Sequence, residues 1–161
     1  MKAILTLLAL ALALQGEKKS NPKFEQLKKL EGVWESSDKN NPTAITYKIG
    51  SAGTIVKETI SMGNHGDMLT VYHLEGDGLG MTHYCAVGNQ PHMKAEKESK
   101  AGTIKFVCTG GSNFACASYQ HMHSLVITFV DADHLKHDWT LFAGGKEAGV
   151  HTFNLVRKKQ E

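Results

Sequence analysis

Apolar and polar positions alternate with a period of two along most of this chain after residue 32. Such alternation predicts β-strands, because successive side chains of a strand point to opposite faces of a sheet. Turns rich in Gly, Asn and Asp separate the segments at intervals of about 8–12 residues, which is typical of a sandwich or barrel. Strands are therefore expected over residues 33–37, 43–50, 53–62, 67–75, 79–87, 91–99, 102–109, 122–130, 133–143 and 148–158.

One segment before these strands has a helical period. Asn21 and Pro22 are helix-start residues, and Phe24, Leu27 and Leu30 follow at helical spacing. The short links between strands favour an up-and-down antiparallel meander, and a long meander loses its exposed edges by closing into a barrel. The sequence therefore predicts an all-β fold, an up-and-down antiparallel β-barrel of about 8–10 strands with a short N-terminal helix.

The same alternation assigns one face of each strand to the barrel interior. A barrel of this size encloses either a packed core or space for one small ligand. The expected interior residues are Ile45, Tyr47, Ile49, Val56, Glu58, Ile60, Met68, Tyr72, Leu74, Met81, His83, Cys85, Ile104, Phe106, Cys108, His123, Leu125, Ile127, Phe129, Leu135, His137, Trp139, Leu141, Phe153, Leu155 and Arg157.

The N-terminus has the pattern of a signal peptide. A lysine at position 2 precedes an apolar run over residues 3–14, and small residues follow. We expect a signal peptide over residues 1–16, cleaved after Ala13 or after Gly16, then a polar linker over 17–22 and the barrel domain over 23–160. The run is shorter than the roughly 20 residues of a spanning helix, so no stable membrane anchor is expected. The protein is expected to be exported, to the periplasm or to the medium.

Composition and charge limit the classes of partner. The chain of 161 residues is 41% hydrophobic and 21% charged, as in one ordinary globular domain. Its formal net charge is +2 with its nine histidines neutral, which is too small to indicate a nucleic-acid surface. We therefore expect no nucleic-acid partner, while the oligomeric state stays open.

The three cysteines, Cys85, Cys108 and Cys116, would meet an oxidising compartment after export. An odd count allows at most one internal disulfide. Cys108 and Cys116 flank a glycine-rich loop and are the favoured pair. The alternative is that all three are small buried residues.

Two stretches resemble known families. The segment Leu30-Glu31-Gly32-Val33-Trp34 resembles the opening of lipocalins, a helix followed by Gly-x-Trp. In that family the Trp packs across the barrel floor and an Arg from the last strand often covers it. Trp34 and Arg157 match these two positions by order and role, so the resemblance implies a lipocalin-like barrel.

The second stretch covers residues 68–93, with a VYH-containing hairpin followed by the run THYCAVGNQP. It resembles uncharacterised secreted bacterial lipocalin-like domains of unknown function, which implies a fold and an exported bacterial protein without an assigned activity. The chain is also similar in length and opening to nitrobindins, which are haem-binding barrels. Haem is therefore a cofactor hypothesis, with no ligating histidine assigned.

His83 is the first candidate for a functional residue. It lies on an interior row, and a buried imidazole needs a partner, since an unpaired buried polar group costs about 1–3 kcal/mol. Tyr72 or Glu58 could supply that partner. Together the three would form a polar patch inside an apolar cup, as in small-molecule pockets. The alternative is a structural polar network that defines the strand register.

Other candidates surround this patch. Asn89 and Gln90 place two amides in a turn at the barrel mouth, where they would bind a ligand or simply form the turn. The candidate ligand-binding residues are Glu58, Tyr72, His83, Cys85, Asn89, Gln90, His123 and Trp139.

Metal and catalytic sites have weaker support. His121 and His123 share a strand face, and His83, Cys85, His123 and His137 could converge inside a barrel, but no HExxH or CxxC motif is present. Same-face neighbours on a strand are about 7 Å apart, too far for a direct bond between His83 and Cys85. No specific metal site and no catalytic residue are therefore predicted.

The function that these patterns favour is the binding of a small apolar or amphipathic molecule inside the barrel. Three alternatives stay open. They are a small hydrolase or isomerase with His83 as general base, a haem or metal binder, and a structural barrel without a ligand.

Overall fold

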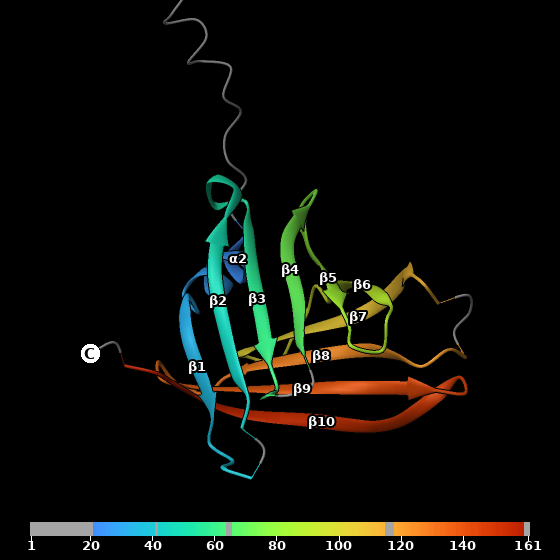
Figure 1. The fold of residues 1–161 in the computed structure, drawn as a ribbon. Helices are drawn as coiled ribbons and strands as arrows, with labels where there is room; N and C mark the ends of the chain where they lie inside the picture. Colours follow the sequence, from blue (N-terminus) through green and yellow to red (C-terminus); the bar gives the residue numbers. More distant parts are fainter. Residues whose placement is uncertain (1–20, 41, 64–65, 115–117, 160–161) are drawn as a thin grey trace, which may run out of the picture.

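The computed structural model describes residues 21–40, 42–63, 66–114 and 118–159. They form a short helix, a single 3₁₀ turn and ten strands, so the predicted all-β fold is confirmed (Figure 1). The helix is α2 (Pro22–Lys28) and the 3₁₀ turn is Ser51–Gly53. The strands are β1 (Gly32–Ser36), β2 (Ala44–Gly50), β3 (Ile55–Ser61), β4 (Asp67–Glu75), β5 (Gly78–Tyr84), β6 (Gln90–Ala95), β7 (Thr103–Ser112), β8 (His121–Phe129), β9 (His134–Ala143) and β10 (Lys146–Arg157).

The strands form one closed antiparallel barrel in sequence order, with β1 joined to β10. Every strand therefore has two neighbours, and no edge is left open. In Figure 1, β1–β4 run across the direction of β8–β10, so the barrel consists of two crossed layers. The predicted signal peptide and its two cleavage sites lie outside the described residues. Among the described residues, no helix is long and apolar enough to cross a membrane.

Helix α2 begins at a side-chain cap. The side chain of Asn21 accepts hydrogen bonds from the backbone N–H groups of Lys23 (3.0 Å) and Phe24 (3.2 Å). Its amide also donates to the carbonyl of Asp77 in the β4–β5 turn, at 3.1 Å. Phe24 and Leu27 are buried beneath the helix. The helix therefore covers the barrel end at which the β4–β5 turn lies.

The predicted interior rows form the core, except near the strand ends. Most of their members are less than one-tenth exposed. Ile49, next to the last residue of β2, is 37% exposed, so this predicted interior position is not part of the core. The other members that are only half-buried are Leu74, Cys108, His123, Phe129, Leu141 and Arg157. They too lie near the end of a strand or beside an irregularity in pairing.

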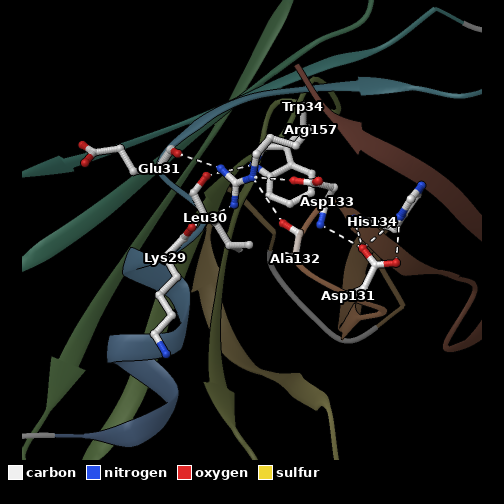
Figure 2. A network of polar contacts seen from close by, with 9 residues as sticks. All are labelled: Lys29, Leu30, Glu31, Trp34, Asp131, Ala132, Asp133, His134 and Arg157. Atoms are coloured by element: carbon white, nitrogen blue, oxygen red, sulfur yellow. Dashed lines mark hydrogen bonds and ion pairs between the residues drawn. The ribbon is translucent and has the colours of Figure 1, made fainter. Parts of the chain in front are cut away.

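The floor of the barrel is a tryptophan covered by an arginine, as the lipocalin resemblance implied (Figure 2). Trp34 is 1% exposed and its indole N–H donates to the carbonyl of Leu30 at 2.8 Å. The Arg157 guanidinium carbon lies 4.2 Å from the centroid of the Trp34 ring. Its two terminal nitrogens donate to the carbonyls of Glu31 (3.0 Å) and Lys29 (2.9 Å). Arg157 therefore joins the last strand to the segment between the helix and the first strand.

Candidate functional site

An apolar pocket lies at the barrel end opposite α2. In an up-and-down barrel successive loops alternate between the two ends, and this pocket includes residues from the β3–β4 and β5–β6 loops. It has a volume of about 220 Å³ and an almost wholly apolar lining. Its inner residues include Ile60, Met68, His83, Cys85, Trp139 and Phe153.

Wider hollows elsewhere are less suited to a small apolar molecule. One of about 490 Å³ lies beside the β1–β2 loop and is lined by charged residues such as Glu35 and Lys39. Another of about 610 Å³ lies outside the barrel against α2 and Arg157. Both are more open to solvent than the pocket of about 220 Å³ inside the barrel mouth. The interior pocket is therefore the candidate ligand site.

His83 lies in the wall of this pocket, but its partner differs from the predicted ones. Its Nδ1 is 3.0 Å from the hydroxyl of Thr70, which is its direct cross-strand neighbour in the β4–β5 pair. Tyr72 instead lies opposite Met81, so the expected bond from His83 to Tyr72 or Glu58 was wrong. Burial lowers the pKa of His83 to about 4, and the imidazole is therefore neutral near pH 7.

A polar network lies in the barrel interior, but it joins Glu58 and Tyr72 to Tyr47 and His137 and does not include His83. The carboxylate Oε2 of Glu58 accepts hydrogen bonds from the hydroxyls of Tyr47 (2.6 Å) and Tyr72 (2.9 Å). The Nε2 of His137 is 2.9 Å from the Tyr47 hydroxyl. Because that hydroxyl donates its proton to Glu58, the imidazole N–H is the donor to it. All four side chains are fully buried and none lines the pocket.

The protonation of this network follows from burial. Burial, together with the adjacent Glu58 carboxylate, raises the pKa of both Tyr47 and Tyr72 well above its ordinary value, so both hydroxyls remain donors. Burial lowers the pKa of His137, although Glu58 and Asp138 oppose this effect. The Oε1 of Glu58 and the Nδ1 of His137 have no hydrogen-bond partner among the described residues. Tyr47 and Glu58 each take part in two of the three hydrogen bonds that join the network.

Replacing Tyr47 by phenylalanine is expected to destabilise the fold more than replacing Tyr72. Tyr47→Phe removes a donor to Glu58 and the acceptor for His137, whereas Tyr72→Phe removes one donor. We expect Tyr47→Phe to lower the free energy of unfolding, measured with urea, by about 2–3 kcal/mol. The decrease for Tyr72→Phe should be smaller than this by about 1 kcal/mol. Equal losses would show that the bond between Tyr47 and His137 contributes nothing to stability.

Cys85 and Trp139, two other predicted site residues, line the pocket together with His83. The rings of His83 and Trp139 are 4.5 Å apart between centroids. The indole N–H of Trp139 is buried and has no acceptor among the described residues. Burial raises the pKa of the Cys85 thiol, which therefore stays protonated near neutral pH. The structure records no carboxylate in contact with His83 among the described residues, so its imidazole has no anionic partner to orient it as a general base.

Asn89 and Gln90 support loops instead of lining the pocket. The amide of Asn89 donates to the carbonyl of Gln120 at 2.7 Å and so joins the β5–β6 loop to the segment before β8. The carbonyl oxygen of the Gln90 side chain accepts from Asn113 at 2.9 Å. This arrangement agrees with the loop-forming alternative for these two residues.

His123 lies apart from His83 and Cys85. It is grouped with His121 and Cys108, and one ligand atom from each of the three lies within 4.8 Å of the others. His137 belongs to the Glu58 network, so the four residues His83, Cys85, His123 and His137 do not converge.

Cys108 is a free thiol in the structure, and Cys116, its predicted disulfide partner, lies outside the described residues. The sequence predicted Cys108 as an interior residue, either half of a disulfide or a small buried thiol, and its place beside the two histidines was missed.

The pocket does not fit a haem. His83 offers a neutral imidazole whose Nε2 has no hydrogen-bond partner among the described residues. However, the volume of the pocket is only about 220 Å³. Clefts that hold drug-sized ligands have volumes of roughly 300–1,000 Å³, and haem is at least as large as such a ligand. We therefore derive no function through haem.

A closed ten-stranded meander with a covered floor and an apolar pocket at its other end defines the class of this protein. It is an up-and-down β-barrel whose architecture is consistent with a lipocalin-like fold. No family model matches the chain, and no curated protein matches it.

Proposed function

We propose that this protein binds a small, apolar molecule in the pocket between β3, β5 and β9. The observation that carries this proposal is the almost wholly apolar lining of a pocket of about 220 Å³ at the barrel end opposite the floor. Burying apolar surface there would contribute about 25 cal/mol per Å², before the unfavourable terms of association.

The size of the pocket favours a ligand built on one aromatic ring or a short alkyl chain. An apolar cavity of about 150 Å³ in another protein binds benzene, and this pocket is somewhat larger, at about 220 Å³. A hydroxyl group buried there without a partner would cost about 1–3 kcal/mol. Toluene should therefore bind more tightly than benzyl alcohol.

The two tryptophans allow a direct test by NMR. Trp139 lines the pocket, whereas Trp34 lies in the floor with its indole N–H bonded to Leu30. Titration of the ¹⁵N-labelled protein with toluene is expected to shift the Trp139 indole N–H signal to saturation and to leave the Trp34 signal unchanged. Equal shifts of both signals, or no saturable shift, would contradict the proposal.

Two variants of one pocket residue provide matched controls. Cys85→Phe fills the pocket and is expected to abolish the shift, while Cys85→Ala keeps the space open and preserves it. Melting temperatures of both variants check that each remains folded, since overpacking costs about 1–3 kcal/mol.

A further inference from the structure

A cysteine within β7 and two histidines at the start of β8 lie close together. One ligand atom from each of Cys108, His121 and His123 lies within 4.8 Å of the others. Thiolate sulfur and imidazole nitrogen are the donors that zinc and copper prefer, while Mg²⁺ and Ca²⁺ require oxygen ligands. The cluster is separate from the residues that line the interior pocket.

The hydrogen bonds of His121 determine which of its nitrogens is free. Its Nδ1 is 2.7 Å from the carbonyl of Tyr119, which can only accept, so Nδ1 carries the proton. The Nε2 of His121 therefore has a lone pair, and it lies 3.2 Å from the Nδ1 of His123. A carbonyl that holds the outer N–H of an imidazole is the usual second-shell contact of a metal-binding histidine.

The distance between these two nitrogens matches a shared metal ion. In a tetrahedral zinc site with Zn–N distances of about 2.0–2.1 Å, two nitrogen ligands lie roughly 3.3 Å apart. The observed separation of Nε2 in His121 and Nδ1 in His123 is 3.2 Å. A metal ion would replace the single proton that now lies between the two rings.

Irregularities in strand pairing bring the three residues together. The β8–β9 register shifts between Met122 and Ser124, which leaves His123 as an extra residue in β8. The β6–β7 register shifts next to Cys108, which pairs with Met93. Regular β7–β8 pairing stops at the pair of Val107 and Ser124. Cys108 and His123 are the next residues on the two strands, just beyond this last regular pair. Such bulges redirect side chains and are frequent next to functional sites.

Aromatic rings hold both imidazoles in place. Phe114 stacks on His121 with ring centroids 5.0 Å apart, and Phe142 stacks on His123 at 3.8 Å. A site whose ligands are already oriented loses less conformational freedom when it binds an ion.

We propose that Cys108, His121 and His123 form a binding site for a thiophilic transition-metal ion of the zinc and copper class. The three side chains would supply three ligands, and the fourth position of a tetrahedral ion would be open to water or to another small ligand.

Binding exchanges protons for the metal. The thiol of Cys108 loses its proton to solvent and binds as a thiolate. The proton on Nδ1 of His123 moves through solvent to Nε2 of the same ring, so the imidazole stays neutral and its Nδ1 has a lone pair for the metal.

The test is metal binding by the full reduced chain in competition with a chromogenic chelator. We expect one Zn²⁺ per chain, and Co²⁺ is expected to give a thiolate-to-cobalt charge-transfer band. Cys108→Ser should abolish that band and weaken Zn²⁺ binding by about 100-fold or more, since removing even a second-shell partner costs about 10–100-fold. Cys85→Ser and His92→Gln are matched controls outside the cluster and should change the affinity less than about threefold.

His123→Gln keeps the proposal testable if Cys108→Ser fails to fold. His123 is partly exposed, so this change should leave the melting temperature nearly unaltered while it weakens Zn²⁺ binding. A parallel titration with Cu⁺ determines which ion of the class binds more tightly. Absence of stoichiometric binding of both ions, or binding that is unchanged in both Cys108→Ser and His123→Gln, would overturn the proposal.

Discussion

Replacing Trp34 by alanine is expected to lower the free energy of unfolding by about 3–5 kcal/mol. The indole is 1% exposed in the barrel floor, its N–H donates to Leu30, and Arg157 covers its ring. Alanine would leave a cavity there and would remove the surface on which the guanidinium packs. Because domains of this size are stable by only about 5–15 kcal/mol, the loss should be visible as a large shift in the urea midpoint.

Two further variants separate the contributions to the floor. Trp34→Phe retains much of the ring volume and removes the bond to Leu30, so it should cost about 1–2 kcal/mol. Arg157→Lys keeps the charge but cannot donate in the same way to the carbonyls of Lys29 and Glu31. If Trp34→Ala cost less than about 1 kcal/mol, the floor would not be part of the cooperative core.

The stability of the barrel is expected to decrease between about pH 6.5 and pH 4 because His83 is buried in its neutral form. The pKa of His83 is about 4 in the folded protein and 6.5 for an ordinary histidine, so the unfolded chain binds the extra proton in this interval. Stability therefore rises with pH, and this contribution is complete above pH 6.5 and lost near pH 4. At about 1.4 kcal/mol per pKa unit, the total is about 3 kcal/mol.

The measurement is the free energy of urea unfolding at pH 7 and at pH 4.5 for the wild type and His83→Gln. Glutamine does not titrate, so the variant should lose about 2 kcal/mol less than the wild type on acidification. The pKa values of His123 and His137 are also lowered, and the variant will therefore retain part of the pH dependence. His92→Gln, at an exposed position, is the matched control and should behave as the wild type does. If the stability of the wild type and of His83→Gln depended on pH in the same way, the loss of stability on acidification would not come from His83.

Much of the barrel could be predicted from short-range patterns. A strand buries alternate side chains, so the period of two located all ten strands, and short glycine-rich links indicated neighbouring antiparallel pairs. The order of Trp34 and Arg157, at the beginning and end of the barrel, was sufficient to predict the floor through the lipocalin resemblance.

Contacts across the barrel could not be predicted in this way. His137 reaches Tyr47 and Glu58 from β9, and this contact depends on the tilt and stagger of strands that are about 90 residues apart. The partner of His83 also depended on the exact hairpin register, which places Thr70 and not Tyr72 opposite it.

The sequence by itself determined the fold class and the strands, because these depend on local alternation and on turns between neighbouring segments. The floor followed from the resemblance of Trp34 and Arg157 to the lipocalin pattern. The tertiary structure decided which polar residues share a site. Bulges in the strand pairing around Cys108 and His123 change the local side-chain directions, and they bring these two residues to His121. A bulge adds one residue to one strand only, and a pattern of period two contains no signal for where that extra residue lies.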